Sequence, residues 1–200
     1  MPSDGTRAAD RAWQHPVRRF RDRGPERDED VLASFSGEAT VKVDDKGRII
    51  LPASIRAVLE GADGRIPTDT KPALIIVYGT DEQKQLQVYT EDSIQEVRAK
   101  IERMPNSPLS RSLRFMYFTR TARVEIDGAG RMLIEKKLRE KLKNEGEIYV
   151  VGLGKTFELW RMDDFEAQIM RDMAQGGLEP GVDPLEKLDR ALAELDRVAQ

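Results

Sequence analysis

The chain contains the same sequence motif twice, with a constant offset of 83 residues. Residues 41–59 read VKVDDKGRIILPASIRAVL, and residues 124–142 read VEIDGAGRMLIEKKLREKL. Identical residues occupy equivalent places: Asp44 and Asp127, Gly47 and Gly130, Arg48 and Arg131, Arg56 and Arg139, Leu59 and Leu142. The likeness resumes downstream, where LIIVYG at 74–79 matches IYVVG at 148–152, and LQVYTED at 86–92 matches FELWRMD at 157–163. Matching motifs in matching order indicate a tandem duplication.

Each copy predicts the same order of elements. Apolar and polar residues alternate at 41–43, and a turn rich in Gly and Asp leads into a second strand, because these residues tolerate the positive φ of tight hairpins. Pro52 suits the first turn of a helix. Two apolar strands and a helix follow, with the helix at 92–103 in copy one and 163–174 in copy two, and copy one has a longer loop around Gly61 to Pro72. The fold class that this pattern predicts is α+β.

Composition excludes several classes of function. The absence of cysteine rules out disulfide frameworks, Cys-ligated zinc, iron–sulfur clusters and thiol nucleophiles. The single histidine, His15, lies in a polar N-terminal segment, and no pair of carboxylates accompanies a nucleophile or a metal-binding pattern. We therefore expect no catalytic residues, no metal, no cofactor and no enzymatic activity. No segment approaches the roughly 20 apolar residues of a membrane span, so we expect a soluble cytoplasmic protein without a membrane partner.

The net charge of −3 hides an uneven distribution of charge. Residues 98–123 hold seven Lys/Arg against one acid, whereas residues 161–200 hold five against ten acids. The basic stretch has arginines at 111, 114, 120 and 123 and aromatic residues at 115, 117 and 118, which suits either a nucleic-acid surface or packing between the copies; packing is favoured. In the acidic tail, leucines at 3–4 spacing from 185 to 195 predict a short amphipathic helix, which would pack within the chain or contact a partner.

The most informative motif is Asp-x-x-Gly-Arg, which stands at a strand–turn–strand corner in both copies. The aspartate can accept hydrogen bonds from backbone amides and so fix the turn. A rigid turn could present Lys46, Arg48 and Arg131 to phosphates or guanine edges, since arginine offers a planar bidentate fork. Equally, each Asp–Arg pair could be a salt bridge that only holds the turn together. Spacing alone does not separate these two interpretations.

Two further residue pairs occupy equivalent places in the copies. Arg56 and Arg139 lie in predicted helices, where their acidic neighbours Glu60 and Glu140 favour ion pairs over ligand contacts. Tyr89 and Trp160 also match, which indicates core or interface anchors.

The motifs resemble those of the MraZ family of bacterial transcriptional regulators. The resemblance is carried by Phe35-Ser-Gly37, by 44–52 with Arg56, by 127–134 with Leu138-Arg139, and by 151–160, and it covers roughly residues 35–170. It implies tandem AbrB-like (SpoVT-AbrB) swapped-hairpin β-barrel modules with pseudo-two-fold symmetry, plus flanking helices. The expected organisation is a disordered leader at 1–34, a first module with its helix at 35–108, a second at 109–175, and an amphipathic tail at 176–200.

The resemblance also implies a function. Such proteins bind direct repeats in double-stranded DNA upstream of the operon for cell division and cell-wall synthesis, their own gene included, and assemble into rings. A cytoplasmic, nucleoid-associated protein without a small-molecule substrate is expected. The residues that would bind DNA are Lys46, Gly47, Arg48, Gly130 and Arg131, and those that would support the loops are Asp44 and Asp127.

The chain departs from the family pattern in three ways. Glu135 stands where a helix-starting proline is usual, and Ala129 stands where copy one has Lys46, so the second loop is the poorer phosphate binder. The leader and the tail extend past the family core. One alternative function is therefore a ring-forming scaffold that binds protein partners through its acidic tail. An enzyme that holds a phosphorylated substrate on the Gly-Arg loops would lack a base and a metal site.

Overall fold

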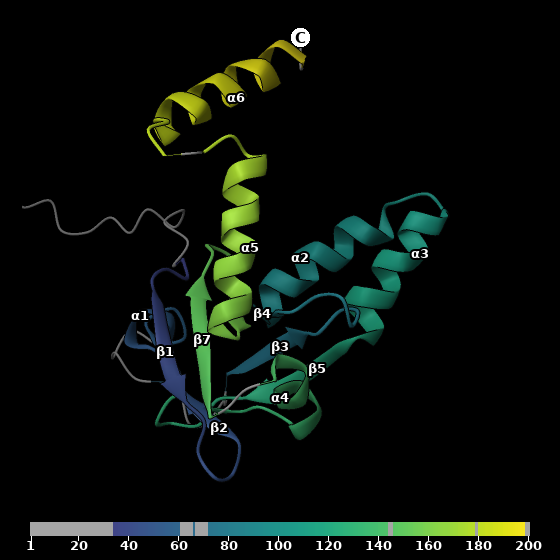
Figure 1. The fold of residues 1–200 in the computed structure, drawn as a ribbon. Helices are drawn as coiled ribbons and strands as arrows, with labels where there is room; N and C mark the ends of the chain where they lie inside the picture. Colours follow the sequence, from purple (N-terminus) through teal and green to yellow (C-terminus); the bar gives the residue numbers. More distant parts are fainter. Residues whose placement is uncertain (1–33, 61–65, 67–71, 144–145, 179, 199–200) are drawn as a thin grey trace, which may run out of the picture. The chain divides into compact units, whose positions relative to one another are not determined.

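The computed structural model describes residues 34–60, 66, 72–143, 146–178 and 180–198 (Figure 1). Its elements, in chain order, are β1 (Glu38–Lys42), β2 (Arg48–Ile50), α1 (Ala53–Arg56), β3 (Ala73–Val77), β4 (Leu86–Thr90), α2 (Glu91–Glu102), α3 (Pro108–Arg114), the π-helix η1 (Phe115–Thr119), β5 (Thr121–Glu125), β6 (Arg131–Leu133), α4 (Lys136–Leu142), β7 (Glu147–Gly152), β8 (Thr156–Trp160), α5 (Met162–Gln175) and α6 (Pro184–Val198). The α+β class is confirmed. Most of the predicted leader and most of the predicted longer loop of copy one lie outside the described residues.

Both copies contribute strands to one six-stranded antiparallel sheet. Its order is β1-β7-β8-β4-β3-β5. From the other edge the order is β5-β3-β4-β8-β7-β1, in which each strand is replaced by the equivalent strand of the other copy. The first strand of each copy pairs with the other copy: β1 pairs with β7 from Glu38↔Val151 to Lys42↔Glu147, and β5 pairs with β3 from Ala73↔Glu125 to Val77↔Thr121. The duplication therefore gives an internal pseudo-two-fold relation and an exchange of strands. The module boundaries expected at 35–108 and 109–175 stay predictions.

The main hydrophobic core lies on one face of this sheet. Side chains of β3 and β7 point alternately to opposite faces, as in any strand, and Leu74, Ile76, Ile148 and Val150 point into this core. Residues of the β2–β6 ribbon and of α1 and α4 close the core from the other side, including Ile49, Leu51, Met132, Ile134, Ile55 and Leu138. Both copies thus contribute apolar residues to one common core.

The opposite face of the sheet carries two smaller hydrophobic clusters, one beneath α2 and one beneath α5. Tyr89 packs with Ile94 of α2 in the first, and Trp160 packs with Phe165 of α5 in the second. Tyr89 and Trp160 are buried, and the indole N–H of Trp160 donates to Glu158 over 2.8 Å. Their predicted role as core anchors is confirmed. The first cluster has an additional cover, Tyr117 of η1, whose ring meets that of Tyr89 edge-on at 6.2 Å.

The basic stretch at 111–123 makes contacts within the chain. The guanidinium of Arg120 stacks over Tyr78 and Phe115, at 5.8 and 5.1 Å from the ring centres. Arg123, on β5 of copy two, pairs with Glu91 of α2 in copy one over 3.0 Å. These contacts confirm the favoured interpretation, packing between the copies, for this part of the stretch.

The tail forms the predicted amphipathic helix, α6 (Pro184–Val198). None of its described residues is buried, and the exposed apolar side chains include Leu185, Leu188, Leu192 and Leu195. Packing of this face within the chain, one of the two expected roles, is therefore not seen among the described residues.

Candidate nucleic-acid interface

Asp44 and Arg48 close the turn between β1 and β2. Oδ1 of Asp44 accepts hydrogen bonds from the backbone N–H groups of Lys46 and Arg48, both at 2.9 Å. Its Oδ2 accepts from Nε of Arg48 at 2.8 Å and lies 2.7 Å from Nη2. Gly47 supplies the left-handed backbone that the reversal needs, with φ at +81°. One carboxylate thus fixes both the backbone of the turn and the side chain that leaves it.

Copy two repeats this arrangement at the turn before β6. Oδ1 of Asp127 accepts from the backbone N–H groups of Ala129 and Arg131 at 3.0 and 2.9 Å, and Oδ2 accepts from Nε of Arg131 at 2.7 Å. Gly130 has φ at +75°. The duplication therefore extends to individual hydrogen bonds, although Ala129 replaces the exposed Lys46 of the first turn.

Both aspartates are held in the charged form. Hydrogen bonds from the side chain and then the backbone of Arg48 lower the pKa of Asp44 to about 2. For Asp127, partial burial acts to raise the pKa, but the hydrogen bonds from the backbone and side chain of Arg131, with that from Ala129, outweigh it and the pKa is lowered. Each turn therefore contains a stable Asp–Arg ion pair at neutral pH.

The salt bridges leave part of each arginine available. A guanidinium has five N–H donors in a rigid fork, of which the aspartate occupies Nε and, for Arg48, one end of the fork. The side chains of Arg48 and Arg131 remain 31% and 40% exposed. Both salt bridges are therefore present, and they leave donors of each guanidinium exposed.

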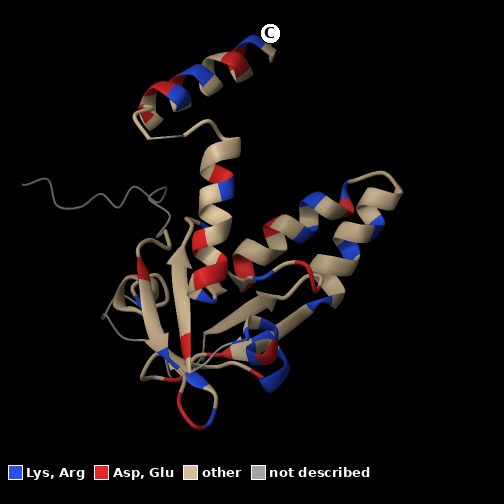
Figure 2. Ribbon diagram, viewed as in Figure 1, with Lys and Arg blue, Asp and Glu red and all other residues tan. Residues whose placement is uncertain are grey.

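The two turns lie at opposite ends of one short ribbon, because β2 and β6 pair antiparallel. The register is Arg48↔Leu133, Ile49↔Met132 and Ile50↔Arg131. Each turn also accepts a hydrogen bond from the other copy: Leu51 N–H donates to Gly130 O over 3.0 Å, and Ile134 N–H donates to Gly47 O over 2.9 Å. Arg48 of copy one lines the same surface hollow as Asp127 and Arg131 of copy two. Figure 2 shows acidic and basic residues side by side on the β1–β2 turn, at the bottom of the view.

The helix arginines act differently from what their acidic neighbours suggest. A β-carbon at Gly47 would overlap the guanidinium of Arg139, with Cζ only 2.6 Å away, and one at Gly130 would overlap the side chain of Arg56. Each arginine therefore lies against the turn of the other copy, and Arg139 donates to the carbonyl of Ile134. Among the described residues neither forms the expected ion pair, since Glu140 pairs instead with Lys136 over 3.7 Å. That expectation is wrong because the strand pairing brings each helix to the opposite turn.

Sequence reasoning also missed two residues of this surface. Ile50 and Leu133 are 56% and 48% exposed, on the same outward face of the ribbon as the two arginines. Their neighbours Ile49 and Met132 point the other way and are buried. The period-two alternation after each Arg is the signal that could have placed them.

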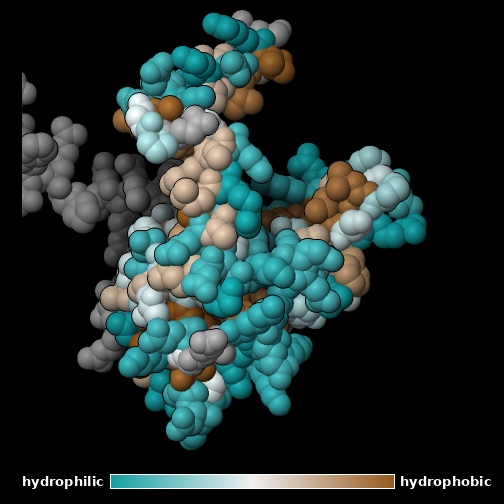
Figure 3. All heavy atoms as spheres, viewed as in Figure 1, coloured by the Kyte–Doolittle hydropathy of each residue, from teal (hydrophilic) through white to brown (hydrophobic). Residues whose placement is uncertain are grey.

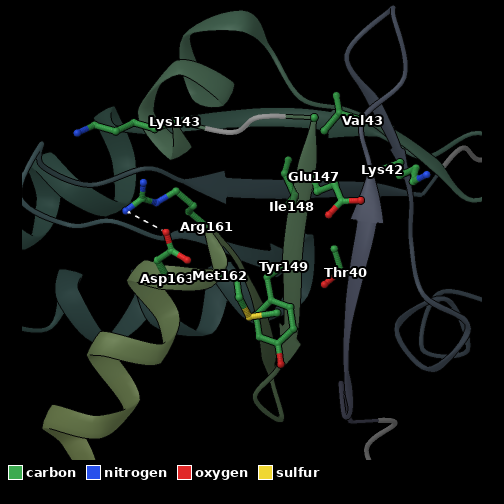
Figure 4. A pocket seen from close by; sticks show the side chains of 11 residues that line it. Thr40, Lys42, Val43, Lys143, Glu147, Ile148, Tyr149, Arg161, Met162 and Asp163 are labelled. Carbon is green, nitrogen blue, oxygen red and sulfur yellow. Dashed lines mark ion pairs between the residues drawn. The ribbon is translucent and has the colours of Figure 1, made fainter.

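Another surface pocket lies elsewhere, between β1, β7 and the start of α5 (Figure 4). Lys143 and Arg161 lie on one side of β7 and Lys42 on the other, and Arg161 is paired with Asp163 over 3.8 Å. The charged residues that line this pocket are of both signs and do not converge on one point. In the part of the chain that the structure describes, no three or more His, Cys, Asp or Glu residues are grouped to bind a metal.

Comparison with known proteins finds relatives of this chain. The family model described as "MraZ protein, putative antitoxin-like" matches residues 117–178. The transcriptional regulator MraZ of Ruegeria pomeroyi is 35% identical over 160 residues, which are 78% of this chain and 96% of the relative. The chain belongs to the MraZ family. Another MraZ transcriptional regulator, from Ruegeria sp. (strain TM1040), is 36% identical with the same coverage, and that of Marinobacter nauticus is 30% identical over 156 residues, 77% of this chain and 99% of the relative.

Membership of the MraZ family confirms the resemblance drawn from the two Asp-x-x-Gly-Arg motifs and identifies the chain as a transcriptional regulator. None of the described helices is long and apolar enough to cross a membrane.

Proposed function

We propose that this member of the MraZ family is a sequence-specific DNA-binding regulator. It binds direct repeats upstream of the operon for cell division and cell-wall synthesis, its own gene included, as a ring of identical subunits in the cytoplasm and at the nucleoid. The residues that bind DNA are Lys46, Gly47, Arg48, Gly130 and Arg131, and Asp44 and Asp127 support them.

The observation that carries the proposal is the duplicated turn. Two rigid turns, with the same carboxylate-to-backbone hydrogen bonds, each direct an arginine outward at the ends of one ribbon. Rigid positioning lowers the entropy that an arginine side chain loses when it binds a phosphate or a base edge. A turn that served stability alone would not need its arginine at the surface.

Each subunit offers few cationic contacts, so affinity must come from repetition. Asp44 and Asp127 neutralise part of the charge of the two arginines, and contacts to phosphate weaken steeply with salt. Identical subunits on adjacent DNA repeats add their contacts without a second cost of association. Direct repeats and a multimeric protein are therefore matched requirements.

Self-association is supported by exposed apolar residues on surfaces of opposite charge. Leu109, Phe115 and Phe118 of α3 and η1 are exposed within the basic stretch, and Met170 and Met173 of α5 are exposed within the acidic one. Figure 3 shows hydrophobic atoms gathered over α3 and along α6. Because two different surfaces would meet, such contacts are head-to-tail, and they form a ring where the rotation between neighbouring subunits closes.

A gel-shift titration with the upstream DNA tests the site. We expect Arg48→Ala to abolish specific binding while the oligomer stays intact, and Arg131→Ala to weaken binding less, because its turn lacks the lysine. Arg190→Ala is a matched control, since Arg190 forms a similar exposed ion pair with Glu186 four residues away. If Arg48→Ala bound like wild type, the proposed role of its turn would be wrong; the reverse ranking would mean that copy two dominates.

A second candidate is a ring-forming scaffold that binds protein partners through α6. The exposed leucines of that helix favour it. Deletion of 176–200 would then remove function and leave DNA affinity unchanged.

A further inference from the structure

The outward face of the β2–β6 ribbon is unusual in combining exposed aliphatic and cationic residues. Because the register pairs Arg48 with Leu133 and Ile50 with Arg131, these four side chains form a rectangle on one face. The arginines occupy one diagonal and the aliphatic residues occupy the other. Ile50 and Leu133 are among the large hydrophobic residues that are exposed in the described chain, whereas their neighbours Ile49 and Met132 are buried.

The dimensions of the ribbon match a DNA groove. The major groove of B-DNA admits a two-stranded β-ribbon. Diagonal neighbours on such a pair are about 7–8 Å apart, which is roughly two base-pair steps of 3.4 Å. Two arginines at this spacing can contact acceptors at the ends of a short run of base pairs, and the aliphatic side chains then face the base edges between them.

An aliphatic side chain has one apolar partner on the base edges of this groove, the C5-methyl group of thymine. An aliphatic side chain packs against this methyl group without a hydrogen bond, and the neighbouring arginines supply the polar contacts. The hydrogen bonds between each turn and the other copy, at Gly47 and Gly130, hold the face rigid.

We propose that Ile50 and Leu133 are specificity-determining residues that read thymine methyl groups in the major groove. The inference rests on the proposed function, because it requires the ribbon to bind DNA.

The test replaces thymine by deoxyuridine throughout the direct repeats of the upstream duplex, which removes the methyl groups and leaves base pairing intact. Fluorescence anisotropy is measured for wild type, for the double variant Ile50→Ala/Leu133→Ala, and for Leu153→Ala, a control with 55% exposure on the β7–β8 turn. We expect wild type and the control to lose about fourfold in affinity for each methyl group that a side chain covers. The double variant should bind the thymine duplex as weakly as wild type binds the uracil duplex, and should not distinguish the two.

Equal binding of both duplexes by wild type, or undiminished discrimination by the double variant, overturns the proposal. Light scattering provides the second measurement: if the double variant changes the oligomer mass, Ile50 and Leu133 belong to an interface between copies and the proposal is wrong. Failure of the proposed function has a different signature, because wild type would then bind the upstream duplex no better than a scrambled one.

Discussion

Gly47→Ala should destabilise the protein more than the backbone conformation alone explains. A non-glycine residue in the left-handed region costs about 1–2 kcal/mol. At Gly47, with φ at +81°, the added carbon would also overlap the guanidinium of Arg139 and displace it from the carbonyl of Ile134. A hydrogen bond from a charged group contributes about 1.5–3 kcal/mol, so we expect the free energy of unfolding to fall by about 2.5–5 kcal/mol.

Gly154→Ala is the matched control. Gly154 has nearly the same φ, +79°, but a β-carbon there meets nothing within 4 Å. Urea unfolding of both variants should show only the backbone cost, about 1–2 kcal/mol, for Gly154→Ala. In an Arg139→Ala background, Gly47→Ala should then cost no more than Gly154→Ala, because the overlapping group is gone. Equal losses for the two variants in the otherwise wild-type protein would refute the contact between the turn and the opposite helix.

Three other outcomes are expected. Because the pKa of Asp44 is lowered, its charged form stabilises the folded state above about pH 4, and this contribution is lost as the pH falls towards 2. The difference in unfolding free energy between wild type and Asp44→Asn should therefore be constant above about pH 5 and shrink below about pH 4. A difference that stayed constant down to about pH 2 would contradict this expectation. Met132→Ala, in the fully buried centre of the ribbon, should cost about 2–5 kcal/mol in urea unfolding, whereas a loss below 1 kcal/mol would mean a loosely packed core. A chain ended after Gln175 should keep its unfolding free energy within about 0.5 kcal/mol, because no described residue of α6 is buried; a larger loss would reveal packing of the tail.

The local structure of each copy could be predicted from the sequence. The alternation at 41–43, the Asp- and Gly-rich turns and the apolar runs correspond to β1, the two tight turns, and β3 and β7. The predicted helices at 92–103 and 163–174 are α2 (Glu91–Glu102) and α5 (Met162–Gln175). These features depend on neighbouring residues, whose preferences the sequence displays directly.

Glu135 stands where a proline is usual in the family, but it leaves the local backbone conformation almost unchanged. It precedes α4 with φ −55° and ψ 148°, nearly the values of Pro52 before α1, φ −54° and ψ 151°. The surrounding strand pairing therefore imposes the backbone conformation that proline adopts unaided. The helix after Glu135 is also the longer of the two, with seven residues against four.

Contacts between the copies could not be predicted from spacing within one copy. The duplication indicated two equivalent units, but not that β1 would pair with β7 and β5 with β3. This exchange is what places Arg56 and Arg139 against the opposite turns, instead of beside Glu60 and Glu140. It also joins β2 to β6, and so creates the exposed face that carries Ile50 and Leu133.

In the proposed function, specificity for DNA resides in the two duplicated turns. Fluorescence anisotropy of the double variant Arg48→Ala/Arg131→Ala tests it most directly, with the upstream duplex and a scrambled duplex compared at several salt concentrations. Wild type should prefer the upstream duplex at every concentration, whereas the double variant, with an unchanged oligomer mass, should bind both duplexes equally and with a shallower dependence on salt. A double variant that still prefers the upstream duplex would show that specificity resides outside these two turns.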